Sequence, residues 1–479
     1  MSQEDRSLEL QGEPLRRLIE AATERILAHI ESLPRQPSAD VEGGVALAHS
    51  LVEDLPETPT AVPELLDLLF ERVVPKSFNT AGPGYLAYIP GGGIPHAAVA
   101  DLIADSVNRY VGVFAAAPGL AQLEENVVRW FCRIAGLPPT ARGVLTSGGS
   151  LANFSALVAA RAERLPENFL SGTLYASDQA HYSVEKAARL AGFPADSVRT
   201  VESDGLFRIR LDALERAIAT DRAAGKTPFL VVGNAGSTNT GAVDDLAALA
   251  ELARRENLWL HVDAAYGGFF LLTEEGRRRM AGIERADSIV LDPHKGLFLP
   301  YGTGALLVRD GETLRRAHAM TADYMPENAA DPELPDYHLL TPELSRGFRG
   351  LRVWLPFRMH GVGPFRRNLE EKLALTRWAT EQLRTIPGIE ILAEPQLSIV
   401  AFRLRRPGPS EEDLDRVNRD LMARVNARKR VYLTGTLLRG RFAIRICVLS
   451  FRTHRDRMEQ ALEDLRAAVR ETPEMPPTP

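Results

Sequence analysis

Residues 286–308 read ADSIVLDPHKGLFLPYGTGALLV, and this stretch decides the fold. Its first part, 288–291, is a short apolar run that predicts a buried strand, and residues 304–308 predict the next strand. The turn between them, Asp292-Pro-His-Lys295, projects a histidine and a lysine from a strand end. Burial among apolar strands lowers the pKa of a lysine, and a neutral amine can form a Schiff base with an aldehyde. Lys295 is therefore the candidate reactive group.

Lysine is scarce in this arginine-rich chain, which sharpens the choice of Lys295. Lys186 and Lys372 lie beside glutamates in helical patterns, where a solvated ion pair is the usual arrangement. A lysine that only extends its ammonium group from a strand end into water is the alternative for Lys295, and it holds unless other residues converge there. The remaining lysines, Lys76, Lys226 and Lys429, lie in turns or in a basic surface run.

Short apolar runs alternate with helix-length patterns from about residue 101 onward. The further predicted strands are 143–146, 173–176, 228–232 and 258–262. This alternation predicts a mostly parallel sheet covered by helices on both faces. Ligands of such sheets bind beyond the carboxyl ends of the strands, so the polar segments that follow these strands are expected to share one edge.

Those polar segments suit a flat, phosphorylated aldehyde. Ser147-Gly-Gly-Ser150 precedes a strong helix pattern, and glycine N–H groups with a helix N-terminus bind phosphate. The segment is neither a Walker A nor a GxGxxG motif, although alone it would be explained by a serine-capped helix. His181 and Asp263 each follow a strand. An imidazole ring, a carboxylate and the amine of Lys295 are therefore expected beside this phosphate-binding segment. Pyridoxal 5′-phosphate (PLP) needs this set.

Composition excludes several other classes of protein. The 479 residues, 45% hydrophobic and 25% charged, suffice for two or three domains. A net charge of -6 argues against nucleic acid as a partner. Cys132 and Cys447 are too few for a disulfide framework, and no CxxC or HExxH spacing predicts a metal site. The N-terminus lacks a signal-peptide pattern and no apolar run of about 18 residues occurs, so a cytoplasmic protein without membrane contact is expected.

Several long motifs resemble, in the right order, those of the group II PLP-dependent amino-acid decarboxylases, the family of aromatic-L-amino-acid and glutamate decarboxylases. They are GPGYLAYIP, TSGGSLAN, SDQAHYSVEKA, HVDAAYGG, DPHKGLFLPYG, DYHLLTPELSRGFRGLRVWLPFRMHG and IRICVLSFRT. The resemblance covers residues from about 80 to 455. It implies the α/β fold of type I PLP-dependent enzymes, with a mostly parallel seven-stranded central sheet, helices on both faces and smaller N- and C-terminal parts. It also implies a homodimer with shared active sites.

The resemblance implies a role for each cofactor residue. The residues concerned are Gly149, Ser150, His181, Thr238, Asp263, Ala265, His294 and Lys295. Lys295 would hold the internal aldimine, His181 would stack on the pyridine ring, and Asp263 would pair with the ring nitrogen. The glycine, the serine and His294 would hold the phosphate, and the threonine and alanine would flank the ring. A pyridinium ring kept protonated by a carboxylate is the electron sink for loss of carbon dioxide through a quinonoid intermediate.

Family members reprotonate the product with a tyrosine on a mobile loop from the neighbouring subunit. Tyr337 lies twelve residues before Arg349, a spacing that matches the family without a gap, so it is the predicted catalytic acid. Tyr324 is the competing candidate, and a simple surface tyrosine is the alternative for both. A tyrosine here, rather than a phenylalanine, favours simple decarboxylation over oxidative formation of an aldehyde.

Some positions depart from the family pattern. Asp292 stands where asparagine is common, and a carboxylate near a phosphate repels it unless the side chain turns away into a hydrogen bond. Asp292 is therefore not predicted to bind the cofactor. Residues 91–93, all glycine, and Thr80 replace larger pocket residues, which leaves the size of the substrate open.

The substrate pocket is predicted to be apolar. Arg109 is the one basic residue near it, so an acidic substrate would lack a counter-ion, and an aromatic or bulky apolar L-amino acid is favoured. Arg445 matches an arginine near the family's active site and either steers the substrate carboxylate or is structural. The predicted pocket residues, some of them from the partner subunit, are Tyr88, Ile89, Pro90, Val111, Val113, Phe114 and Arg445.

Three parts are predicted. Residues 1–94 form a helical segment that packs on the dimer partner, since its helix patterns enclose no core of their own. Residues 95–365 form the large PLP-binding domain, and residues 366–479 form a small α/β domain. The predicted function is PLP-dependent decarboxylation of an L-amino acid to the amine and carbon dioxide. Another fold type I carbon–carbon lyase, which needs more basic groups, and a non-enzymatic PLP-binding relative, which need not keep Lys295, are the alternatives.

Overall fold

A seven-stranded sheet lies at the centre of the computed structural model, which describes residues 8–320, 323 and 334–473. Its strands are β1 (Arg142–Thr146), β2 (Gly172–Ser177), β3 (Val198–Val201), β4 (Thr227–Asn234), β5 (Trp259–Ala264), β6 (Ser288–Leu291) and β7 (Gly304–Val308). Their order is β1-β7-β6-β5-β4-β2-β3, and β7 alone runs antiparallel to its neighbours. The predicted α/β fold with a mostly parallel sheet is confirmed.

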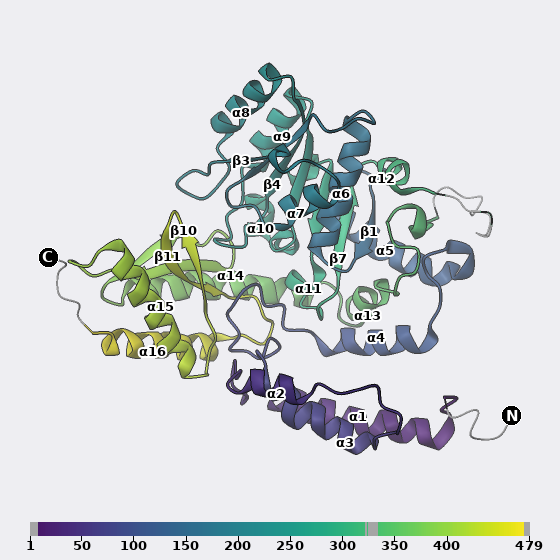
Figure 1. Cartoon of the computed structure of the whole chain (residues 1–479), viewed down its shortest axis with the longest axis vertical. Helices are drawn as coiled ribbons and strands as arrows, with labels where there is room; N and C mark the ends of the chain where they lie inside the picture. Colours follow the sequence, from purple (N-terminus) through teal and green to yellow (C-terminus); the bar gives the residue numbers. More distant parts are fainter. Residues whose placement is uncertain (1–7, 321–322, 324–333, 474–479) are drawn as a thin grey trace.

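Helices cover both faces of this sheet (Figure 1). The α-helices of the described residues are α1 (Gly12–Ser32), α2 (Gly44–Ser50), α3 (Val62–Asp67), α4 (Pro95–Val107), α5 (Pro118–Ile134), α6 (Gly149–Arg164), α7 (Ser183–Leu190), α8 (Leu211–Ala223), α9 (Leu246–Arg255), α10 (Glu274–Arg279), α11 (Pro293–Gly296), α12 (Gly311–His318), α13 (Gly350–His360), α14 (Gly363–Arg384), α15 (Glu411–Ala427) and α16 (Arg455–Glu471). Shorter 3-10 and π-helical turns join several of them.

Alternate residues of the central strands face two separate cores. Leu230 and Val232 of β4 pack into the core that contains α6 and α7, whereas Val231 between them packs into the core that contains α8 and α9. Because successive side chains of a strand point to opposite faces, a strand buried on both faces is a continuous apolar run. This is the pattern that predicted these strands from the sequence.

A second, antiparallel sheet forms the small C-terminal part of the chain. Its strands are β8 (Ile389–Ala393), β9 (Ile399–Leu404), β10 (Thr434–Leu438) and β11 (Arg441–Cys447), in the order β10-β11-β9-β8. A segment before α4 also joins the region of this sheet: the amide N–H of Leu86 donates to the carbonyl of Tyr432, and that of Cys447 donates to the carbonyl of Leu86. The chain that follows the first three helices is therefore attached to the second sheet.

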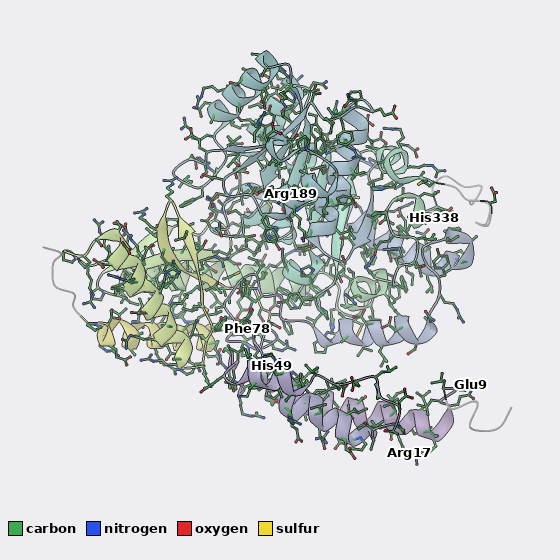
Figure 2. All side chains as sticks on the ribbon, in the orientation of Figure 1. Glu9, Arg17, His49, Phe78, Arg189 and His338 are labelled. Atoms are coloured by element: carbon green, nitrogen blue, oxygen red, sulfur yellow. The ribbon has the colours of Figure 1, made fainter. Side chains whose placement is uncertain are left out.

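The helices α1 to α3 form an arm that lies apart from the main body (Figure 1). No residue of α1, α2 or α3 is buried. Glu9, Arg17 and His49 mark the course of this arm, and Phe78 marks the place where it meets the body (Figure 2). There the ring of Phe78 packs on that of Tyr432, with centroids 4.7 Å apart. Outside this junction the arm leaves apolar side chains in solvent.

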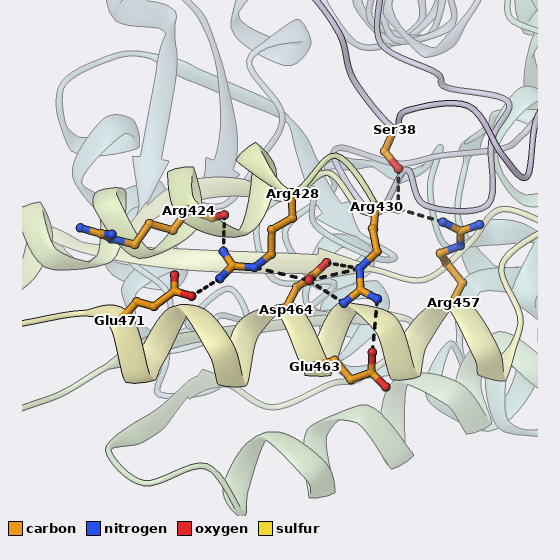
Figure 3. Close-up of polar contacts among 8 residues, drawn as sticks. All are labelled: Ser38, Arg424, Arg428, Arg430, Arg457, Glu463, Asp464 and Glu471. Atoms are coloured by element: carbon orange, nitrogen blue, oxygen red, sulfur yellow. Dashed lines mark hydrogen bonds and ion pairs between the residues drawn. The ribbon is translucent and has the colours of Figure 1, made fainter.

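A network of arginines and carboxylates ties α16 to the chain before β10 and to the root of the arm (Figure 3). Asp464 of α16 is buried and lies 2.6 Å from a guanidinium nitrogen of Arg430 and 3.6 Å from one of Arg428. The carbonyl of Arg430 accepts hydrogen bonds from the hydroxyl of Ser38, at 2.7 Å, and from Arg457, at 3.0 Å. One buried carboxylate thus fixes the segment to which the N-terminal arm is attached.

None of the helices in the described ranges is both long and apolar enough to cross a membrane.

Candidate active site

Polar side chains from the ends of three neighbouring strands meet at one edge of the central sheet. Asn234 at the end of β4 is in register with Asp263 of β5, and Asp292 directly follows β6. They line a cavity of about 280 Å³. The lining residues are Ser147, Gly148, Gly149, Ser150, Leu151, Asn153, His181, Ser183, Asn234, Gly236, Ser237, Thr238, Asp263, Ala265, Tyr266, Asp292, His294 and Lys295.

The residues predicted for the cofactor come together here. All eight line this one cavity, although they lie at or after the ends of five different strands: Gly149, Ser150, His181, Thr238, Asp263, Ala265, His294 and Lys295. Their individual contacts with a cofactor stay predictions.

The pKa of Lys295 differs from the expected one. Its Nζ atom lies 2.9 Å from Oδ2 of Asp292. Burial lowers the pKa of Lys295, but the carboxylates of Asp292 and Asp263 outweigh it, so that the pKa is raised above its ordinary value. The prediction of a lowered pKa, made from burial alone, is wrong. Asp292, which is not predicted to bind the cofactor, directs its carboxylate at the reactive amine.

A second lysine is also buried, contrary to the prediction of a solvated ion pair. Lys372 of α14 has no exposed side-chain surface, and its ammonium group donates to the carbonyl of Thr453 at 2.7 Å and to Glu371 at 2.8 Å. Burial lowers the pKa of Lys372. It lies outside the cavity, so Lys295 remains the lysine of the site.

Asp263 is held in place by two donors. The backbone N–H of Ala265 donates to its Oδ1 at 3.1 Å, and the amide of Asn153 donates to its Oδ2 at 3.1 Å. The carboxylate is buried and lines the cavity. A fixed, buried carboxylate suits the predicted pairing with a protonated ring nitrogen.

A chain of hydrogen bonds runs behind Asp263. The indole N–H of Trp259 donates to Oγ of Ser288 at 2.8 Å, and this hydroxyl lies 2.8 Å from Nδ1 of His261. Nε2 of His261 lies 2.9 Å from the carbonyl oxygen of Asn153, so we assign the ring proton to Nε2. Burial lowers the pKa of His261 to about 4, so the imidazole is neutral. The chain fixes the amide orientation of Asn153 and hence its bond to Asp263.

The same asparagine reaches His181. Its amide also donates to Oγ of Ser183 at 2.9 Å, and this hydroxyl lies 2.7 Å from Nδ1 of His181. The backbone N–H of Ser183 points to the same nitrogen at 3.3 Å. Burial lowers the pKa of His181, which favours a neutral ring suited to stacking. Asn153 therefore links the ring histidine to the ring carboxylate.

The N-terminus of α6 forms the anion-binding part of the cavity. Gly149 begins this helix, and a Cβ built on it would be 3.0 Å from Oδ2 of Asp292 and 3.3 Å from Cβ of Ala265. Only glycine leaves this approach to the backbone open. His294 points one ring nitrogen at the carbonyl of Thr303, 2.6 Å away, and burial lowers its pKa. His294 thus offers a neutral ring rather than a fixed positive charge.

Arg445 holds the loop that carries Thr238. Its guanidinium donates to the carbonyls of Thr238, Asn239 and Tyr88 and to the hydroxyl of Thr434. The side chain is buried, and burial lowers its pKa. Through these bonds Arg445 positions the cavity wall. The residue itself does not line the cavity. Its contact with a substrate stays a prediction.

The other predicted substrate residues lie outside the cavity. Tyr88, next to the loop that Arg445 holds, is 54% exposed and has a positive φ of 49°. The others lie in the same chain away from the lining, most of them buried: Ile89, Pro90, Val111, Val113 and Phe114. Whether the last three line a partner's pocket stays a prediction.

Tyr337 is buried in its own chain. It has no exposed surface, and the guanidinium of Arg346 lies 4.8 Å from the centre of its ring. Its hydroxyl has no hydrogen-bond partner among the described residues. Burial raises the pKa of this phenol well above its ordinary value, and Glu124 acts in the same direction. Tyr337 does not line the cavity; the competing candidate, Tyr324, lies outside the described residues.

Sequence reasoning missed the residues that orient the site. Asn153 lies four positions after the glycine that starts α6, on the helix face that points at the sheet edge, and this spacing was a usable signal. His261 precedes Asp263 by two residues and therefore lies on the same strand face. Asp292 is not among the predicted cofactor residues because a carboxylate repels a phosphate. Its pairing with Lys295 depends on the backbone of the turn, which the sequence does not fix.

The glycines at 91–93 have a structural role. A Cβ built on Gly91 would be 2.1 Å from the carbonyl oxygen of His294 and 3.3 Å from that of Lys295. The loop thus packs its backbone against the turn that carries the reactive lysine. Gly91 is set by this close approach, and its small size carries no information about the substrate.

Comparison with known proteins identifies the family. Residues 47–405 match the model of the pyridoxal-dependent decarboxylase conserved domain. The chain is 34% identical over 467 residues to an aromatic-L-amino-acid decarboxylase from Bacillus atrophaeus, with 97% of each chain covered.

Solved structures agree. The crystal structure of Oryza sativa TDC with PLP and tryptamine is similar with a TM-score of 0.92 and 28% identity, covering 96% of this chain and 99% of the other. That of Catharanthus roseus tryptophan decarboxylase in complex with L-tryptophan has a TM-score of 0.89 and 26% identity, with 96% and 99% covered.

The cavity fits the cofactor that this family requires. A helix N-terminus opened by Gly149 suits a phosphate, buried Asp263 suits a ring nitrogen, and the amine of Lys295 suits an aldehyde. With the matches of sequence and structure, this donor set shows that the chain belongs to the pyridoxal-dependent decarboxylase family and is a PLP-dependent carboxy-lyase.

Proposed function

We propose that the enzyme removes the α-carboxyl group of an aromatic or bulky apolar L-amino acid and releases the amine and carbon dioxide. The observation that carries this substrate class is the commitment of Arg445 to backbone carbonyls and a threonine hydroxyl. An arginine so engaged, with its pKa lowered by burial, offers no counter-ion for an acidic substrate side chain. The names of the similar enzymes, an aromatic-L-amino-acid decarboxylase and a tryptophan decarboxylase, support the same class.

Each of these cavity residues has a separate proposed role in the reaction. The bound cofactor would supply the electron sink that takes up the charge left at the α-carbon when carbon dioxide departs. Asp263, held by Asn153 and Ala265, would keep the ring nitrogen protonated. Lys295 would hold the cofactor between turnovers and return to it when the amine leaves. His181 would cover one face of the ring. The quinonoid intermediate expected for such enzymes stays a prediction.

Tyr337 is the proposed acid that returns a proton to the α-carbon. In its own chain the phenol lies under Arg346, away from the cavity, so it cannot reach the reacting atoms from this position. A neutral phenol is available over the working pH range because burial raises its pKa. We infer that the tyrosine acts in the site of a second copy, after leaving this position.

A homodimer is the proposed assembly. The arm and α4 leave large apolar side chains exposed, and contiguous exposed apolar surface indicates a protein interface. The exposed residues concerned are Ile19, Ile26, Leu27, Leu65, Leu69, Val99, Leu102, Ile103 and Val107. An arm without one buried side chain in its α-helices gains stability only by packing on another surface. We propose that the arm, which makes up most of the predicted segment 1–94, packs on the partner, with the domains of each copy divided at about 95 and 366. Residues 85–93 of that segment pack within their own chain.

A reducing cytoplasm is the proposed compartment. Cys132 and Cys447 are both free and buried, as expected of thiols that play no part in disulfides.

One experiment tests the proposed reaction. Cofactor-loaded enzyme is mixed separately with phenylalanine, tyrosine, tryptophan and glutamate, and the carbon dioxide and amine released are measured. We expect amine from the aromatic substrates and none from glutamate. Tyr337→Phe, which removes one hydroxyl, is expected to lower amine formation at least about 100-fold, because an acid catalyst contributes 10²–10⁴.

A matched variant controls for the loss of a buried phenol. Tyr175→Phe removes a buried hydroxyl that donates to Asp221 at 2.7 Å, outside the cavity, and is expected to keep near-normal turnover. Amine from glutamate instead of the aromatic amino acids would overturn the substrate class. Normal turnover in Tyr337→Phe would overturn the role of Tyr337 and leave the carboxy-lyase assignment intact.

A further inference from the structure

Asp292 and Lys295 form an ion pair inside the cavity that is incomplete as it stands. Oδ2 of Asp292 lies 2.9 Å from the ammonium nitrogen of Lys295. The residue is 2% exposed, and its other oxygen, Oδ1, has no hydrogen-bond partner in the described part of the chain. A buried carboxylate oxygen without a donor costs free energy. The arrangement therefore suits a state in which a further group is present.

The carboxylate also lies beside the anion site. A Cβ built on Gly149 would be 3.0 Å from Oδ2 and 3.3 Å from Oδ1 of Asp292, and Gly149 begins α6. Both oxygens therefore border the helix N-terminus that suits a phosphate. Like charges at such separations in a buried site repel strongly, so a bound phosphate disfavours an ionised neighbour.

Few of the surrounding groups are charged. The titratable groups that face this pair are Asp263 from β5, His181 before α7, His294 from α11, Tyr301 before β7 and Cys447 from β11. Burial lowers the pKa of both histidines, raises that of the Tyr301 phenol and raises that of the thiol to about 12, so these four are neutral near pH 7. Two carboxylates and one ammonium group remain. The ammonium group is the one positive charge of this set.

Cofactor capture removes that positive charge. An amine must be neutral to attack an aldehyde, yet the carboxylate of Asp292 helps to raise the pKa of Lys295 above its ordinary value. The lysine must therefore give up a proton during condensation. Oδ2 of Asp292, at 2.9 Å, is already in hydrogen-bond contact with the ammonium group and is in place to accept it.

We propose that Asp292 takes the proton of Lys295 when the lysine condenses with the cofactor aldehyde, and keeps it as a neutral carboxylic acid beside the bound phosphate. The ammonium group gives one proton to the carboxylate, and the free amine attacks the aldehyde carbon. The carbonyl oxygen then leaves as water. Ammonium, carboxylate and aldehyde become imine, carboxylic acid and water, so atoms and charge balance without exchange with solvent.

The proton stays on Asp292 for two reasons. Condensation consumes the ammonium group that stabilised the carboxylate, and the phosphate adds negative charge next to it. The acid also gains an O–H donor that can meet a phosphate oxygen, which completes the hydrogen bonding of the buried carboxyl group.

Infrared difference spectroscopy tests the protonation directly. Cofactor-free protein is mixed with PLP, and the C=O stretching region is compared before and after loading, in water and in deuterium oxide. We expect a carboxylic-acid band that shifts in deuterium oxide to appear on loading of the wild type and to be absent from Asp292→Asn. Glu125→Gln, which removes a buried carboxyl group outside the cavity, is expected to keep the band.

Two further measurements keep the test decisive if Asp292→Asn folds poorly. Pyridoxine 5′-phosphate, which carries the phosphate but an alcohol in place of the aldehyde, leaves the ion pair intact and is expected to give the wild type no band. The rate of PLP loss from the wild type is expected to rise with pH, by up to about tenfold per pH unit, while the acid is being ionised and then to level off, and to stay flat in Asp292→Asn.

The proposal is overturned if loading gives the wild type no acid band, if the band survives in Asp292→Asn, or if pyridoxine 5′-phosphate produces it. No amino acid is present in these experiments. Their outcome is therefore independent of the substrate class proposed above.

Discussion

The amide of Asn153 donates to Oδ2 of Asp263 at 3.1 Å, and the carbonyl oxygen of the same amide lies 2.9 Å from Nε2 of His261. Asn153→Leu keeps the size of the side chain but removes both bonds. Because the carboxylate of Asp263 loses a donor that fixes its orientation, it would pair less well with the ring nitrogen. We expect PLP to dissociate about tenfold more readily, since a lost hydrogen bond to a charged group is worth about 1.5 kcal/mol or more. Equilibrium dialysis of the cofactor measures this.

A second buried asparagine provides the control. Asn418 of α15 makes three hydrogen bonds to the backbone of Leu404 in β9 and Leu414 in α15, away from the cavity. Asn418→Leu is expected to lower the free energy of unfolding about as much as Asn153→Leu does, and to leave cofactor affinity unchanged. Equal losses of affinity in both variants would contradict the positioning role of Asn153.

His261 predicts how stability depends on pH. Burial holds its folded-state pKa at about 4, below the ordinary value of 6.5. Between these two values the unfolded chain binds a proton that the folded chain does not bind, so stability falls as the pH drops from about 6.5 towards 4. At about 1.4 kcal/mol per unit, this group accounts for roughly 2–3 kcal/mol. Urea unfolding of cofactor-free protein at pH 7 and pH 4.5 measures the loss.

Replacement of the histidine isolates its share. His261→Gln, which cannot gain this charge, is expected to lose less stability over the same pH interval than the wild type. His49→Gln, at an exposed position of the arm, is expected to keep the wild-type dependence. If His261→Gln shows the full wild-type loss, another group is responsible.

A side chain added at Gly91 is expected to clash with the turn that carries Lys295. A Cβ at this position would meet the carbonyl oxygen of His294 at 2.1 Å, a backbone atom that cannot move without the turn. Gly91→Ala is therefore expected to displace the turn and to slow the reaction of Lys295 with PLP, measured by the absorbance of the loaded enzyme. Gly119→Ala in α5, where a Cβ would meet no atom within 4 Å, is the matched control and is expected to be neutral or slightly stabilising.

How far the sequence predicts this site depends on what each residue contacts. The cofactor residues follow strands of one sheet, so their meeting at one edge follows from topology, and the cavity bears this out. Strand β3 was missed because it is an edge strand with one buried residue, Val201, and so lacks the apolar pattern. The raised pKa of Lys295 could not be predicted because it depends on a side chain, Asp292, whose direction no periodicity fixes.

Loss of the buried positive charge of Arg346 is expected to lower the free energy of unfolding strongly. Its guanidinium lies 2.6 Å from Glu124, neither side chain has exposed surface, and it also donates to the carbonyl of Leu145 at 3.0 Å. Arg346→Met leaves the buried carboxylate of Glu124 without its partner, which costs about 3–5 kcal/mol of unfolding free energy. Arg349→Met, which breaks a more exposed pair with Glu343, is expected to cost about 1 kcal/mol.

A double variant tests the effect of the ion pair on stability separately from its effect on the packing of Tyr337. Adding Glu124→Gln to Arg346→Met removes the uncompensated carboxylate and is expected to recover much of the lost stability. The double variant still lacks the guanidinium that covers the ring of Tyr337. If Arg346 holds the phenol in its buried position, the double variant exposes it, and tyrosine fluorescence quenching by iodide increases. Unchanged quenching would mean that the apolar residues around the ring hold Tyr337 without help from the arginine.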